Sequence, residues 1–435
     1  MKEKKNTKAK RGSGVKKWSI LTAVFAILTV VSIVGTNIAL SAGQAINIFL
    51  KTDTYKIVDK GNGKEDTTYF ESDFDSVEEL EENGKKVAEQ LHTEGSVLLK
   101  NNGVLPLKKD AKVSTLSHSS VDMVTCGTGA ADIDTSNAPT LKEALESRGV
   151  SVNSTLWDFY TKGAGKEYVR TPGKEANQEN QSGRAGWHIN EVPASAYTNE
   201  VKSSFAQYKD AAIVTISRIS GEGSDLAVDE FKDGKNVLSL TAEEQDMLKM
   251  AKSNFENVIV LINSTNALEC DFIDNEEYGI DAVLWIGYTG GWGLNGVADI
   301  LVGNANPSGR LVDTTTPSME SIYGADYTNY DPKDEEHWYS VANGQLDGNH
   351  HYITYQEGIY VGYRYYETRY EDIVMGTANV GDYDYATTVA YPFGYGLSYT
   401  EFEYSNFKAE YNKDTDSFDV EVDVTNTGDV AGKEV

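Results

Sequence analysis

The sequence predicts an α/β fold: a layered α/β sandwich on a mostly parallel sheet, preceded by a transmembrane helix and followed by part of a β-sandwich. Between residues 76 and 302, short apolar runs of strand length alternate with segments of helical periodicity. After Pro392, apolar and polar residues alternate as they do in antiparallel strands. Residues 18–40 are almost continuously apolar, which is the length of a membrane span.

The strand at the centre of this pattern is 211–217, with the sequence AAIVTIS. A run this apolar, entered from the helical segment 199–209, is typical of a strand buried on both faces. The residues that follow, from Arg218 to Asp225, read RISGEGSD. In open α/β sheets, functional groups lie just past the carboxyl ends of the strands, and Glu222 stands there between two glycines. The other interpretation is a solvated Glu in a strand-to-loop turn.

Local signals predict the other elements of the α/β part. Ser76 caps a helix that runs to residue 94, and Thr241 with Glu244 forms the capping box of a helix that runs to about residue 254. Further strands are expected at 113–116, 257–262 and 282–286. A helix is expected at 141–147, stopped by Gly149, and another after Gly290-Gly291, which runs through 301 and is ended by Gly303. Because strands and helices alternate, we expect a parallel sheet covered by helices on both faces.

The charge of the chain is strongly negative and unevenly spread. The 435 residues carry a net charge of −28; the first 17 hold eight Lys and Arg and one Glu, which leaves 31 basic and 66 acidic residues for the rest, a balance of −35. Such a body repels nucleic acid and anionic lipid, so we expect no nucleic-acid partner. A neutral substrate such as a sugar suits it better than a phosphorylated one.

The N-terminal region predicts attachment to a membrane. We expect a basic cytoplasmic tail at 1–17, a transmembrane anchor at 18–42 and a polar linker at 43–75. Basic residues before a span stay in the cytoplasm, so the body is expected to be extracellular at the cell membrane. The alternative is a signal peptide cleaved after the Ser41-Ala42-Gly43 stretch, which leaves a secreted body.

The α/β domain is expected to span 76–322, and two further regions follow it. Residues 323–390 are rich in Tyr, Asp and Asn and too long for an ordinary loop, which indicates a functional insertion or a lid. Residues 391–435 have the alternation of antiparallel strands and supply only two or three of the roughly seven strands of an immunoglobulin-like sandwich.

Few motifs for other chemistries are present. The two cysteines, Cys126 and Cys270, exclude a disulfide framework and a cysteine-based zinc site, although a single disulfide stays open. The stretch CGTGAAD at 126–132 departs from the dinucleotide pattern at its last glycine. No P-loop, nucleophile elbow or metal-ligand set is found, so neither a cofactor nor a metal is expected. What is left is carboxylate chemistry, with Glu222 as the leading candidate and Asp225 three residues beyond it.

Five motifs in order carry a family resemblance: EGSVLLKNNGVLPL, SRISGEGSD, GGWGLNGVADILVGNANPSGRL, GIYVGYRYYE and YPFGYGLSYTEFEYS. Residues from about 75 onward resemble the C-terminal α/β-sandwich of family 3 glycoside hydrolases. The tail, ending in VTNTGDVAGKEV, resembles the start of their fibronectin-type-III-like domain. The family contains β-glucosidases, β-xylosidases and related retaining exo-enzymes, so the resemblance implies hydrolysis of a terminal β-linked sugar from a β-glucoside or oligosaccharide.

The resemblance also implies roles for individual residues. Glu222 matches the family's acid/base position, while Arg218 and Asp225 beside it are expected to hold the loop or to bind substrate. The segment 306–310 matches a signature that we expect to be mainly structural. In the family, the nucleophile is an Asp on a (β/α)8 barrel, and no such barrel is found before residue 75. Permuted members of the family place the barrel last, so a barrel is expected beyond Val435.

Two alternatives remain at this point. One is a surface-anchored carbohydrate-binding module without turnover, which the aromatic residues at 323–370 would suit. The other is a dinucleotide-dependent enzyme, which rests only on the CGTGAAD stretch.

Overall fold

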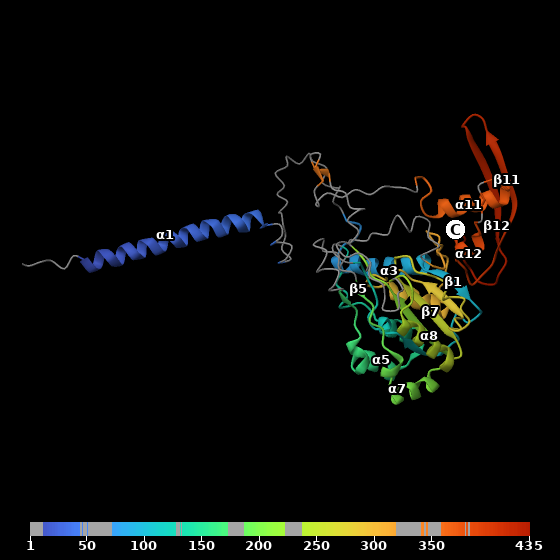
Figure 1. Cartoon of the computed structure of the whole chain (residues 1–435), viewed down its shortest axis with the longest axis horizontal. Helices are drawn as coiled ribbons and strands as arrows, with labels where there is room; N and C mark the ends of the chain where they lie inside the picture. Colours follow the sequence, from blue (N-terminus) through green and yellow to red (C-terminus); the bar gives the residue numbers. More distant parts are fainter. Residues whose placement is uncertain are drawn as a thin grey trace, which may run out of the picture. The chain divides into compact units, whose positions relative to one another are not determined.

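The computed structural model describes residues 12–43, 46, 50, 72–127, 131, 133–172, 187–221, 237–318, 341–342, 345–346, 358–378, 380–381 and 383–435. The chain divides into two units, Met1–Asp75 and Ser76–Val435, and each is described by itself (Figure 1).

The first unit contains the long helix α1, Gly12–Ser41. Its segment Val15–Ser41 has a mean hydropathy of 2.2 in its most apolar window, which makes the helix long and apolar enough to cross a membrane. A signal sequence near an N-terminus has the same character. The side chains of Thr22, Thr29 and Asn37 each donate to the backbone carbonyl four residues earlier, so each polar side chain has a hydrogen-bond partner within the helix.

The second unit is built on a six-stranded sheet in the order β1-β8-β7-β6-β2-β3. Its strands are β1 Val97–Asn101, β2 Lys112–Leu116, β3 Ser151–Val152, β6 Ala211–Ser217, β7 Val258–Asn263 and β8 Ala282–Trp285. Five strands run parallel, and β1 pairs antiparallel with β8 at one edge. The prediction of a mostly parallel sheet is confirmed.

Helices cover both faces of the sheet, as expected (Figure 1). Successive residues of each central strand point to opposite faces, so Ile213 joins one buried cluster and Val214 the other. One cluster includes residues of α4 Leu141–Glu146 and α9 Gly293–Val302; the other includes residues of α5 Ser154–Thr161, α7 Asn199–Ser204 and α8 Ala242–Asn254. Burial on both faces explains why β6 and β7 are apolar at most positions.

The helix ends follow the predicted signals. The Ser76 side chain accepts from Glu79 N at the start of α3, Val77–Gly95, and the Thr241–Glu244 capping box is formed. Gly303 ends α9 with φ +81°. The helix predicted at 199–209 is shorter, because α7 stops at Ser204 and a 3₁₀ turn, Phe205–Gln207, follows and buries the Phe205 ring against Phe255.

The motif at 306–310 ties the C-terminal segment to the sheet domain. The Asn306 side chain accepts from Ser398 Oγ and Tyr399 N and donates to the Ala431 carbonyl. Both oxygens of Glu434 bind Arg310 Nη2 at 2.8 and 2.9 Å. These contacts are of the structural kind that the sequence led us to expect for this motif.

The C-terminal region contains α11 Tyr363–Met375, α12 Tyr385–Thr388 and the hairpin β11 Phe402–Asn412 with β12 Ser417–Asn426. Two further pairs of two-residue strands come earlier in the chain. They are β4 Thr171–Pro172 with β5 Trp187–His188, and β9 Val341–Ala342 with β10 Gln345–Leu346. One face of the hairpin is apolar and exposed, including Tyr404, Tyr411, Phe418, Val420 and Val424. The two antiparallel strands match the alternation of the sequence, and a partial β-sandwich at 391–435 stays a prediction.

Candidate active site

The candidate site lies where the order of the parallel strands reverses. Along the chain these five strands run β2, β3, β6, β7, β8, but in the sheet β2 lies between β3 and β6. In such doubly wound sheets, ligands bind at the carboxyl ends of the strands that flank this reversal. Here β2 leads into Ser117 and β6 leads into Arg218. Glu222 and Asp225 follow within the same segment but lie outside the described residues.

The Arg218 side chain is 1% exposed and entirely engaged by the protein. Its Nη1 and Nη2 donate to the two carboxylate oxygens of Glu244 at 2.9 and 3.0 Å. Its remaining N–H groups donate to the carbonyls of Ser217, Val237 and Ser239 at 2.9, 2.5 and 2.5 Å. A guanidinium has five N–H groups, so none is left for a ligand. Of the two roles expected for Arg218, the structure supports holding the loop and gives no support to binding substrate.

The Asn263 side chain joins the ends of four strands. Fully buried at the end of β7, it accepts from Ser217 Oγ at the end of β6 and from Val124 N in the loop after β2, at 2.9 and 2.7 Å. Its Nδ2 donates to the carbonyls of Val124 and of Gly287, which follows β8, at 2.9 and 2.7 Å. A single amide thereby fixes the loops of this edge relative to one another.

Ser220, two residues before Glu222, is held by side chains from two neighbouring loops. The Tyr288 hydroxyl accepts from Ser220 N at 3.0 Å and donates to Ser220 O at 3.3 Å. Ser220 Oγ donates to Asn266 Oδ1 at 2.7 Å. Gly127, in the loop after β2, lies so close to Ser220 that a Cβ added to it would contact Ser220 O and Gly221 Cα.

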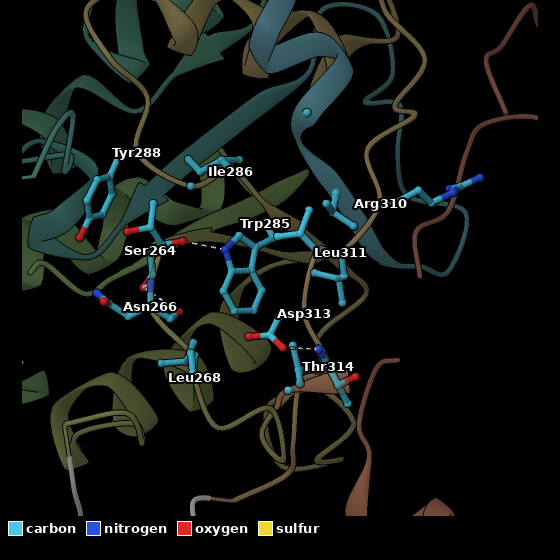
Figure 2. A pocket seen from close by; sticks show the side chains of 18 of the residues that line it. Ser264, Asn266, Leu268, Trp285, Ile286, Tyr288, Arg310, Leu311, Asp313 and Thr314 are labelled. Carbon is cyan, nitrogen blue, oxygen red and sulfur yellow. Dashed lines mark hydrogen bonds between the residues drawn. The ribbon is translucent and has the colours of Figure 1, made fainter. Parts of the chain in front are cut away.

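A cavity of about 630 Å³ opens beside these contacts (Figure 2). Asn266 and Tyr288, which bind Ser220, both line it and lie on the same side of it in Figure 2. Trp285 stands in the middle of the wall, with its indole N–H bound to Ser264 O at 2.6 Å. Other lining residues include Leu91, His92, Leu268, Leu311, Asp313, Thr316, Gly362 and Tyr366.

The make-up of this cavity suits a sugar. Apolar and aromatic walls with a few polar groups are typical of small-molecule sites, and the face of an aromatic ring stacks on the C–H face of a sugar ring. Gly362 and Tyr366 come from the region predicted as an insertion or lid, so its described part contributes to the wall.

A buried carboxyl group supports the loop after β2. Ser117 has φ +86°, a strained value for a residue with a side chain, and its Oγ donates to Glu191 at 2.5 Å. Glu191 also accepts from the backbone N–H groups of His118 and Val192. Burial raises the pKa of Glu191 to about 7, although these hydrogen bonds act in the opposite direction. The sequence analysis missed Glu191, because nothing in its local pattern marks it.

Cys126 begins the CGTGAAD stretch at 126–132, and Cys270 lies far from it in the chain. Cys126 and Cys270 are both free, so the single disulfide left open by the sequence is absent. Of the glycine-containing stretch only Cys126, Gly127 and Ala131 are described, and Gly127 packs on Ser220 and Gly221.

Residues 96–363 match the model of the glycosyl hydrolase family 3 C-terminal domain. The chain belongs to glycosyl hydrolase family 3. It is 32% identical over 351 residues to a β-glucosidase of Ruminococcus albus, covering 80% of this chain and 31% of the relative. It is also 32% identical over 398 residues to β-glucosidase A of Butyrivibrio fibrisolvens, covering 82% of this chain and 42% of the relative. The family predicted from the five motifs is confirmed.

Solved structures support the same family. β-Glucosidase 3B of Thermotoga neapolitana, solved in complex with glucose, has a TM-score of 0.61 and 28% identity, covering 81% of this chain and 43% of that one. A β-glucosidase of Paenibacillus barengoltzii has a TM-score of 0.57 and 28% identity, covering 80% and 33%. This family 3 chain therefore spans well under half the length of these relatives.

Proposed function

We propose that this chain supplies the acid/base half of a retaining β-glucosidase, with Glu222 as the proton donor. The observation that carries the proposal is the position of the β6 exit, at the strand-order reversal of a family 3 C-terminal domain. Glu222 comes five residues after the end of that strand. A (β/α)8 barrel domain would supply the nucleophile, an Asp.

Retaining hydrolysis needs two carboxyl groups about 5–5.5 Å apart across the glycosidic bond. The nucleophile attacks the anomeric carbon and forms a glycosyl–enzyme ester, while the Glu222 carboxylic acid gives its proton to the departing oxygen. The Glu222 carboxylate then takes a proton from water, and the resulting hydroxide equivalent attacks the ester and releases the sugar. Both steps invert the anomeric carbon, so the overall configuration is retained.

The substrate class follows from the relatives and from charge. The relatives named above are β-glucosidases, and a strongly acidic chain favours a neutral sugar over a phosphorylated one. We place the leaving group, an alcohol or a second sugar, beside the Trp285 cavity, and Asp225 remains a candidate for binding substrate. The alternative of a binding module without turnover is less favoured, since these relatives are enzymes.

The experiment uses the protein that carries both catalytic domains. Glu222→Ala is expected to lower kcat/KM for an alkyl β-glucoside by about 10²–10⁴-fold, the usual contribution of general acid–base catalysis. With a 2,4-dinitrophenyl β-glucoside, whose leaving group departs without protonation, the glycosyl–enzyme still forms, and azide should restore turnover by attacking it without needing a base. Glu243→Ala, at an exposed position of α8, is the control and should leave the rate unchanged. Wild-type turnover in Glu222→Ala would remove Glu222 from the mechanism.

We also propose that α1 anchors the chain, with the body outside the cell. The basic residues before α1 favour retention of the N-terminus in the cytoplasm. The intact mass of the protein in the membrane and in the medium fractions distinguishes the alternatives: a species in the medium that begins near Gly43 would show a cleaved signal peptide and contradict the anchor.

A further inference from the structure

The backbone just before Glu222 is held by Tyr288, a residue that the sequence analysis did not single out. Glu222 stands between Gly221 and Gly223, which have no side chains with which to fix it. The nearest preceding residue with side-chain contacts of its own is Ser220, and the contacts that hold it come from the loops after β7 and β8.

The contact from Tyr288 reaches across the sheet. Because β8 and β6 are separated by β7, the two strands lie about 10 Å apart, and only a long side chain spans that distance. The Tyr288 hydroxyl meets both backbone polar groups of Ser220, accepting from its N–H and donating to its carbonyl. It thereby fixes the peptide planes on both sides of Ser220, where the Asn266 contact fixes only the side chain.

Tyr288 is itself held in place. Gly287, the residue before it, has φ +60° and gives its carbonyl to the fully buried Asn263 amide at 2.7 Å. The residue after it, Thr289, is fully buried, and the N–H of the next residue, Gly290, donates to Thr125 O at 2.7 Å. The tyrosine therefore projects from a rigid base toward Ser220.

We propose that Tyr288 is a positioning residue for the proton donor, holding Ser220 so that the Glu222 carboxyl group lies at the glycosidic oxygen. The proposal rests on the proposed function and deepens it. Misplacing a catalytic group by about 1 Å can cost about 100-fold in rate. The loss falls on the proton-transfer step, so it depends on how much the leaving group needs a proton.

The test is Tyr288→Phe in the protein that carries both domains, measured with two substrates. For an alkyl β-glucoside, a poor leaving group, kcat/KM is expected to fall at least about 10-fold. For a 2,4-dinitrophenyl β-glucoside, whose leaving group departs without protonation, the fall should stay within about threefold. Tyr395→Phe is the matched control, since this half-buried tyrosine also donates to a carbonyl, that of Leu99, but lies outside the cavity wall; it should leave both rates unchanged.

A second readout does not depend on activity. Hydrogen exchange of the Ser220 amide should accelerate in Tyr288→Phe, because the acceptor of that N–H is removed, and not in Tyr395→Phe. Faster exchange with equal losses on both substrates, or with no loss, overturns the positioning role. Unchanged exchange overturns the contact itself. If instead Glu222→Ala keeps wild-type turnover, the proposed function fails, and that result is separate from the exchange measurement.

Discussion

Replacing Arg218 by Met tests which of its two expected roles it has. The change removes the cation beside Glu244, whose side chain is only 3% exposed. Among the described residues, Thr241 N is then the one donor left to this buried carboxylate. The change also removes the donors to three backbone carbonyls at the β6 exit. Breaking a buried ion pair from one side costs about 3–5 kcal/mol. We therefore expect the free energy of unfolding to fall by about 4 kcal/mol.

Urea denaturation of the chain in detergent measures this loss. Arg148→Met is the matched control, because Arg148 also donates two hydrogen bonds to a carboxylate, that of Asp299, at 2.9 and 3.0 Å. These two side chains are 16% and 22% exposed, so Arg148→Met should lower the free energy of unfolding clearly less. Arg218→Met combined with Glu244→Leu should cost less than the two changes summed, because no charge stays buried. A loss below about 1 kcal/mol for Arg218→Met, together with a raised KM in the two-domain protein, would refute the structural role.

Two further predictions concern stability. Burial raises the pKa of Glu191 to about 7 from its ordinary value of 4.5, so the folded state prefers the protonated form. The stability that this group contributes is full below about pH 4.5 and is lost as the pH rises through 7, by about 3 kcal/mol in total. Unfolding free energies from pH 4 to 8 should show this fall in the wild type but not in Glu191→Gln, and parallel curves would contradict it. Gly303→Ala should lower the melting temperature more than Gly376→Ala: both glycines end helices with positive φ, but only at Gly303 does an added Cβ meet Pro106, at 2.8 Å. Equal losses would show that the Pro106 contact costs nothing.

The elements that the sequence predicted well are those whose signal is local. Strand β6 is apolar at nearly every position because both of its faces are buried, and the Thr241–Glu244 box is a four-residue pattern. Both can be read in a short window. Strand β1 also begins with a short apolar run, but its antiparallel pairing with β8, almost 190 residues later, has no local signature.

The parts of the site that escaped prediction are assembled from distant segments. Glu244 was recognised as a capping residue, yet the same carboxylate also pairs with Arg218, 26 residues away. Glu191 meets Ser117 across 74 residues, and Tyr288 meets Ser220 across 68. The order of strands in the sheet creates these contacts, and periodicity does not determine that order.

The pairing of Arg218 with Glu244 also resolves an electrostatic conflict in the proposed mechanism. A general acid must keep its proton near neutral pH, which requires a raised pKa, and a nearby unpaired cation lowers the pKa of a carboxyl group instead. Arg218 precedes Glu222 by only four residues. Because both oxygens of Glu244 lie within 3.0 Å of its guanidinium, the pair has no net charge to act on the acid. The chain can thus use a five-donor side chain to hold the end of β6 without weakening the proton donor that follows.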